Sequence, residues 1–287
     1  MDLVGMRAGM TRTLFGGLFD DAALFPPGNA TMAEAAPAHH RHQASWYADL
    51  VGPFICPDTR LSELDGSIAV SVVVTGGPDA VDKAIRQVAD GRLAAVEVSG
   101  VGDAAAARQA VGSIPSGTRG FIEVPWGPAQ PKMLDNLAGS GCAAKLRTGG
   151  TVAAAFPTET QLAEAIIGCV ARDLPFKCTA GLHHAIRHTA AGTKLEHHGF
   201  LNLLLATDAA IDGASRADVI AVLAERTADV IAYRTRQLDS GHIRATRRRF
   251  LSYGTCSILE PLEDLAALGL LTAHDSVQVA NAPERPS

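Results

Sequence analysis

Several features that would assign this chain to a membrane, secreted or metal-binding class are missing. No apolar stretch approaches roughly 18 residues, so we expect no transmembrane helix. The first residues lack the basic segment, apolar run and small-residue cleavage site of a secretory signal. The five cysteines are odd in number, scattered through apolar segments and never spaced as C-x-x-C, which predicts reduced core thiols. Together these absences predict a cytoplasmic protein.

The chain also lacks a surplus of basic residues. Its 25 Lys and Arg residues against 30 Asp and Glu residues give a formal net charge of −5. This balance argues against nucleic acid and anionic membranes as partners. The main exception is the Arg-rich stretch at 244–249, which reads either as a solvated helix end or as an anion- or partner-binding site. We therefore expect a small-molecule substrate as the partner and leave a homo-oligomer open.

What the sequence does have is a regular alternation of apolar, strand-like runs with helical patterns, which indicates a parallel α/β structure. Eight strand candidates lie near 14–19, 50–56, 68–75, 93–99, 119–125, 141–147, 174–180 and 249–256. The length of 287 residues suits one (β/α)8 barrel, which typically takes about 250 residues. We predict an α/β protein with a single (β/α)8 TIM barrel over 1–276 and a flexible tail over 277–287.

The alternation is interrupted between the seventh and eighth strand candidates. Residues 199–211 and 216–238 read as two helices separated by Asp212-Gly213. We therefore expect a helical insertion at about 185–248, placed where a barrel keeps its active-site loops. Such an insertion would serve as a lid or as an oligomer contact.

Four of the strand candidates each carry one charged residue in the middle of a β-type run. These residues are Glu97, Glu123, Lys145 and Lys177. Because neighbouring residues of a strand point to opposite faces, the four charges can share one face, the interior of a barrel. An isolated buried charge is costly, so such groups are normally paired or functional. The two interpretations are a structural salt-bridge network and a catalytic or ligand-binding centre, and we favour the centre.

Two neighbouring lysines have a specific chemical use. A nearby cation and partial desolvation favour the neutral amine, which attacks a carbonyl carbon to form a Schiff base. A carboxylate such as Glu97 or Glu123 would move protons. Turns at the strand ends, several of them glycine-rich, would hold a substrate phosphate or carboxylate through side chains and backbone N–H groups. The residues predicted to bind substrate are Asp20, Arg147, Thr148, Gly149, Thr179, His183, Gly254, Thr255 and Ser257.

The lysine segments carry a family resemblance. Lys145 in Lys-Leu-Arg-Thr-Gly-Gly resembles the Schiff-base lysine segment of deoxyribose-phosphate-aldolase-type class I aldolases. Lys177 in Phe-Lys-Cys-Thr-Ala-Gly resembles their second lysine segment, and Gly254-Thr-Cys-Ser resembles the turn after their final strand. The resemblance implies that Lys145 is the nucleophile and Lys177 the cation that activates it. It also implies an acid on an earlier strand as proton carrier, with Glu97 as first choice and Glu123 as second.

We therefore expect a lyase or aldolase that acts on a small carbonyl compound through a lysine Schiff base and needs no cofactor. Whether this substrate is phosphorylated or carboxylated stays open. One alternative is a metal-dependent isomerase or hydrolase with Asp20, Glu97, Glu123 and His183 as ligands. A second alternative is a non-enzymatic metabolite-binding or assembly module on the same scaffold.

Overall fold

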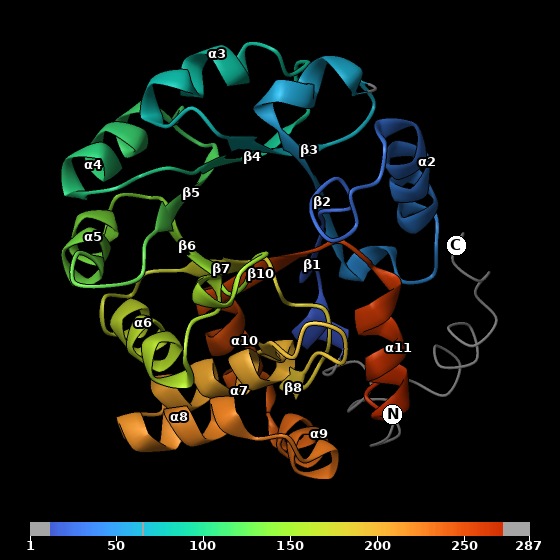
Figure 1. Ribbon diagram of the computed structural model, residues 1–287, viewed down its shortest axis with the longest axis vertical. Helices are drawn as coiled ribbons and strands as arrows, with labels where there is room; N and C mark the ends of the chain where they lie inside the picture. Colours follow the sequence, from blue (N-terminus) through green and yellow to red (C-terminus); the bar gives the residue numbers. More distant parts are fainter. Residues whose placement is uncertain (1–11, 65, 272–287) are drawn as a thin grey trace.

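The computed structural model describes residues 12–64 and 66–271 and contains a closed barrel of eight parallel strands (Figure 1). The strands are β1 Phe19–Asp21, β2 Val51–Pro57, β3 Val70–Val74, β4 Leu93–Val98, β5 Arg119–Val124, β6 Ala143–Arg147, β7 Phe176–Thr179 and β10 Phe250–Thr255. The barrel closes where β10 pairs with β1. The predicted α/β (β/α)8 architecture is confirmed.

Helices surround the barrel on its outer side (Figure 1). They are α2 Met32–Gln43, α3 Val81–Ile85, α4 Ala104–Ser113, α5 Gln130–Leu137, α6 Glu159–Ala171, α7 Phe200–Ile211, α8 Arg216–Ala224, α9 Ala228–Gln237, α10 Ser240–Arg249 and α11 Leu259–Ala267. Short 3-10 helices cover Ala48–Leu50, Asp58–Glu63, Pro78–Ala80 and Ala153–Ala155. No helix within the described residues is long and apolar enough to cross a membrane.

The alternation of side chains along the strands explains why these segments form a barrel wrapped in helices. In β3, Val70, Val72 and Val74 are fully buried in the main core, while Ser71 between them joins the barrel interior. An apolar outer face of this kind drives each strand against its covering helices. The charged residues of the strands therefore point to the inner face of the barrel, because apolar side chains and helices occupy the outer face.

The first strand lies later in the chain than predicted. Residues 12–15 are helical, and β1 begins only at Phe19. The apolar residues Leu14, Phe15 and Leu18 that suggested a strand are buried in the main core as part of the helical turn and its connection. This shift places Asp20 within β1, in register with Gly254 of β10.

The segment between β7 and β10 contains more structure than the two helices expected. The predicted helix over 216–238 is broken at 225–227 into α8 and α9, and α10 contains the Arg-rich stretch. A small hairpin, β8 His188–Thr189 and β9 Glu196–His197, precedes α7. Because α8 packs on α6 and α7, and α9 packs on α7, these helices thicken the layer on one side of the barrel (Figure 1). The predicted tail at 277–287 lies outside the described residues.

Candidate functional site

The barrel interior brings the four charged residues together. Lys145 of β6 is in register with Glu123 of β5 on one side and Lys177 of β7 on the other. The carboxylate of Glu97 in β4 bridges the two lysines. Its Oε1 lies 2.6 Å from Lys177 Nζ, and its Oε2 lies 3.0 Å from Lys145 Nζ. One carboxylate therefore holds two ammonium groups.

Asp20 belongs to this network as well. Its Oδ2 lies 2.6 Å from Lys177 Nζ and accepts a hydrogen bond from Ser252 Oγ at 2.7 Å. On the other side of Lys177, Ser71 Oγ donates to Glu97 Oε1 at 2.8 Å. We expected Asp20 at the loop after β1 as a substrate ligand. The structure corrects this expectation, because its carboxylate is buried and bound to Lys177.

The pKa shifts show which groups keep their charge. Burial disfavours the ammonium form of Lys177, but Asp20 and Glu97 outweigh burial and raise its pKa above the ordinary lysine value. Burial alone would raise the pKa of Glu97, yet the two lysines and Ser71 lower it to about 2. Burial raises the pKa of Asp20 despite its contact with Lys177. Lys177 is thus held as a cation and Glu97 as an anion.

Two irregularities in the barrel make room for this arrangement. Between β10 and β7, Phe250 pairs with Phe176 and Tyr253 pairs with Cys178, so that two residues of β10 oppose Lys177. This bulge places Ser252 where it can bond Asp20. Between β1 and β2 the register also shifts, and a Cβ on Gly52 would overlap Asp20 Oδ1. The absence of a side chain at Gly52 is what lets Asp20 point into the barrel.

The network has a closed end and a more open end. An apolar cluster of Ala95, Phe121, Ala143 and Leu251 forms the closed end. Lys177 Nζ lies 4.9 Å from the centre of the Phe121 ring in this cluster. The side chain of Lys177 is 0% exposed and that of Lys145 is 3% exposed. Exposure then rises to 19% at Glu123 and 44% at Arg147, whose Nε lies 3.5 Å from Glu123 Oε1. Lys145 is therefore the lysine nearer the solvent.

A serine that the sequence did not suggest connects Lys145 to Glu123. Lys145 Nζ donates a hydrogen bond to Ser99 Oγ at 3.4 Å. Ser99 Oγ in turn donates to Glu123 Oε2 at 2.9 Å. Lys145 Nζ also lies 3.5 Å from Glu123 Oε2 directly. The signal in the sequence was the two-residue spacing from Glu97 to Ser99, which places both on one strand face. Ser71, which bonds Glu97, and Ser252, which bonds Asp20, were not predicted either.

Two predicted substrate ligands, Thr148 and Gly149, make structural contacts at the strand ends. Thr148 Oγ1 donates to the carbonyl of Ala180 at 2.6 Å, and this bond ties the turn after β6 to the turn after β7. A Cβ on Gly149 would lie only 2.7 Å from Gly181 Cα. The small size of Gly149 therefore serves the close approach of two backbones, and its part in substrate binding stays a prediction.

The turn after β10 is likewise occupied with its own structure. Thr255 Oγ1 donates to the carbonyl of Ser257 at 3.0 Å, and Ser257 Oγ accepts the N–H of Glu260 at 3.3 Å in the first turn of α11. Thr255 and Ser257 thus shape the helix start, and their part in substrate binding stays a prediction. Thr179 pairs in register with both Gly254 and Arg147, which places it and Gly254 near the open end of the network. Their predicted contact with substrate stays a prediction.

His183 contacts α11 and its leading turn. Its Nδ1 lies 3.0 Å from Glu260 Oε2 and 3.6 Å from Cys256 Sγ. In the alternative metal-ligand set of Asp20, Glu97, Glu123 and His183, His183 bonds Glu260 and the Lys177 ammonium lies between the carboxylates of Asp20 and Glu97, and this set stays a prediction. Within the described part of the chain, the metal-type donors that cluster within 4.8 Å belong to Asp208, Asp212 and His242. The His242 ring there already bonds Asp208 at 2.9 Å.

The contacts of His183 predict a pH dependence of stability. Burial opposes protonation, but Cys256 and Glu260 outweigh it and raise the pKa of His183 from 6.5 to about 9. The resulting stabilisation is fully present below pH 6.5 and is lost as the pH rises through 9. We expect urea unfolding to show a loss of about 2 kcal/mol over this interval that His183→Gln removes. The exposed His40→Gln should keep the wild-type slope, and an equal slope in His183→Gln would contradict the assignment.

Comparison with known proteins gave no match to any family model, curated protein or solved structure.

Proposed function

We propose that the protein is a lyase of the class I aldolase type, which forms a Schiff base between Lys145 and a small carbonyl substrate. The (β/α)8 barrel is a common enzyme scaffold whose active sites lie at the C-terminal ends of the strands. The observation that carries the proposal is the position of Lys145. It lies between the buried ion pair of Lys177 and Glu97 and the more exposed carboxylate of Glu123.

The surroundings of the two lysines favour Lys145 as the nucleophile. Lys177 is fully buried between Asp20 and Glu97, which hold it as an ammonium ion. An ammonium group has no lone pair for attack on a carbonyl carbon. Lys145 shares Glu97 with that fixed cation and has its other contacts toward the open end. The resemblance of the Lys145 segment to class I aldolases supports the same assignment.

Ser99 and Glu123 supply a path for the proton that Lys145 must lose. In this path the Lys145 ammonium gives a proton to Ser99 Oγ while the Ser99 proton moves to Glu123, in the direction of the existing hydrogen bonds. The neutral amine adds to the carbonyl carbon and forms a carbinolamine. Glu123 then returns the proton to the departing hydroxyl, water leaves, and the iminium ion remains as an electron sink for C–C cleavage or formation. Glu97, with its lowered pKa, acts as a fixed counter-ion in this scheme.

Arg147 points to the class of substrate. Its side chain is 44% exposed, follows Lys145 on the same strand face and lies 3.5 Å from Glu123. A guanidinium group in this place suits a carboxylate or phosphate oxygen. The register partners Thr179 and Gly254 are small and lie at the same level. We therefore favour a short aldehyde or ketone that carries one anionic group.

Trapping with borohydride tests the proposal. Incubation with pyruvate or acetaldehyde followed by borohydride should add the mass of the reduced adduct to the peptide that contains Lys145. Lys145→Arg keeps the positive charge in the barrel and should abolish the adduct, whereas the exposed Lys132→Arg should leave it unchanged. Peptide mass spectrometry locates the label. Undiminished labelling in Lys145→Arg would reject Lys145 as the nucleophile.

A structural or ligand-binding role for the network is the second candidate, and the burial of Lys145 favours it. Only 3% of that side chain is exposed. Removing one partner from a buried ion pair is strongly destabilising, so such a network is retained as part of the structure even without a catalytic role. If the wild type binds small carbonyl acids in calorimetry but traps none of them, the non-enzymatic interpretation replaces the lyase.

A further inference from the structure

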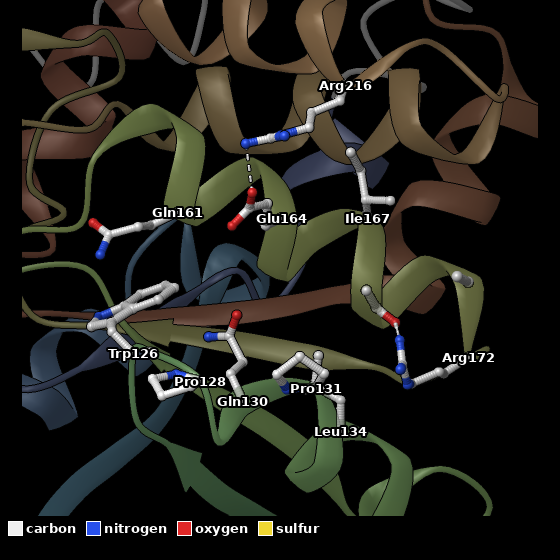
Figure 2. A pocket seen from close by; sticks show the side chains of 13 residues that line it. Trp126, Pro128, Gln130, Pro131, Leu134, Gln161, Glu164, Ile167, Arg172 and Arg216 are labelled. Atoms are coloured by element: carbon white, nitrogen blue, oxygen red, sulfur yellow. Dashed lines mark hydrogen bonds and ion pairs between the residues drawn. The ribbon is translucent and has the colours of Figure 1, made fainter.

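A separate cavity lies outside the barrel, between α5 and α6 (Figure 2). Its volume is about 690 Å³, and its walls include Trp126, Pro131, Leu134 and Ile167. Cavities that bind small molecules typically measure about 300–1,000 Å³ and are mostly apolar with a few polar groups. We propose that this cavity binds a planar aromatic or heteroaromatic monoanion.

The walls of the cavity favour a flat ring. Figure 2 shows the Trp126 indole at one end, with the rings of Pro128 and Pro131 following along the same side. Trp126 Nε1 donates to the carbonyl of Arg147 at 2.9 Å, which fixes the orientation of the indole. A fixed indole beside apolar side chains offers a surface on which an aromatic ring stacks or packs edge-on.

Gln130 supplies an unused hydrogen-bond donor. The residue is 8% exposed, and its buried Nε2 finds no hydrogen-bond partner among the described residues. Figure 2 shows the side chain reaching from α5 into the space between Trp126 and α6. A buried amide without a partner costs free energy, which an acceptor atom on a ligand would recover once the Gln130 amide turns toward the cavity. The occupant therefore carries a ring or exocyclic acceptor.

The rim of the cavity provides the positive charge. Arg216 Nη2 lies 2.6 Å from Glu164 Oε1, and both side chains are more than half exposed, at 57% and 51%. Exposed pairs of this kind contribute little to stability, so Arg216 can exchange Glu164 for a ligand carboxylate. Figure 2 places this pair across the cavity from Gln130. An anionic group on the ring thus meets a cation at the rim.

This cavity is distinct from the lysine centre. Trp126 connects the two through its bond to the Arg147 carbonyl, and the residues that line the cavity are different from those of the lysine centre. Binding in the cavity therefore does not depend on the proposed Schiff-base chemistry. Lys145→Arg should leave it unchanged, so a failure of one proposal is distinguishable from a failure of the other.

Titration with anthranilate, a planar fluorescent monoanion, tests the inference. The chain has two tryptophans, and we expect anthranilate to quench Trp126 by energy transfer. Trp46→Phe should keep the saturable quenching, and Trp126→Phe should remove it. Gln130→Leu should raise the Kd about three- to tenfold, the effect of one lost hydrogen bond, as should Arg216→Gln. Gln87→Leu, an exposed change outside the cavity, should have no effect.

Two ligand controls separate shape from charge. Cyclohexanecarboxylate has the charge without the planar ring, aniline has the ring without the charge, and both should bind at least tenfold more weakly in calorimetry. Three results would overturn the proposal. They are equal affinity for these three compounds, full anthranilate affinity in both Gln130→Leu and Trp126→Phe, and no binding by the wild type at millimolar concentration. Self-association that displaces anthranilate as protein concentration rises would overturn it as well, since a second copy would then be the occupant.

Discussion

Replacing Lys177 by methionine will lower the free energy of unfolding by about 3–5 kcal/mol, the range typical of breaking a buried ion pair. The reason lies in the carboxylates that remain. Lys177 Nζ is the group between Asp20 Oδ2 and Glu97 Oε1, at 2.6 Å from each. Without it, two buried carboxyl groups face each other across an apolar side chain. Equilibrium urea unfolding, read by circular dichroism, measures the change.

Two companion variants show that the loss comes from charge. Lys132→Met removes an exposed lysine and should change stability by less than about 0.5 kcal/mol. Adding Asp20→Asn to Lys177→Met removes one of the uncompensated carboxylates and should recover part of the loss. A penalty below about 1 kcal/mol for Lys177→Met would mean that the barrel interior admits water and that the network is not dry.

Gly52→Ala is the second substitution with a large expected effect, about 2–3 kcal/mol of lost stability from overpacking. Its Cβ would overlap Asp20 Oδ1 and approach Asp20 Cγ to 3.1 Å, so Asp20 has to turn away from Lys177. The change therefore breaks the network without altering any charge. If the lyase proposal holds, it should also lower the yield of the borohydride adduct. Thermal and urea unfolding give the stability.

The control for this steric effect is Gly102→Ala, because a Cβ at Gly102 meets nothing within 4 Å. It should leave stability within about 0.5 kcal/mol of the wild type. Shortening the partner in Gly52→Ala/Asp20→Ala should remove the clash, so the two substitutions should be strongly non-additive. Strict additivity would show that Gly52 serves some other purpose.

Much of the charged centre was readable from local pattern. Because side chains alternate along a strand, Glu97, Glu123, Lys145 and Lys177 were expected to point to the same side of the sheet. The alternation of strands with helices predicted that this side is the interior of a barrel. The first strand was misplaced because Leu14, Phe15 and Leu18 form an apolar run that suits a buried helical turn as well as a strand. That error hid the place of Asp20 inside the barrel.

The roles of the turn residues could not be read in the same way. Thr148, Thr255 and Ser257 stand at strand ends, where hydroxyl groups serve substrate binding or turn formation equally well. Thr148 bonds the carbonyl of Ala180 in the turn after β7, whereas Thr255 and Ser257 bond backbone groups two and three residues further along their own segment. The acceptor of Thr148 depends on how two loops pack, which sequence spacing does not contain.

The sequence alone determined the (β/α)8 barrel and the inward direction of two acids and two lysines, because both follow from the alternation of side chains along each strand. Only the tertiary structure decided which charges meet. Asp20 and Lys177 are 157 positions apart, and Asp20 and Ser252 are 232 apart. Their contacts depend on barrel closure between β1 and β10, on a bulge in β10 and on the missing side chain of Gly52. Register between distant strands is a property of the closed sheet as a whole, so no single segment specifies it.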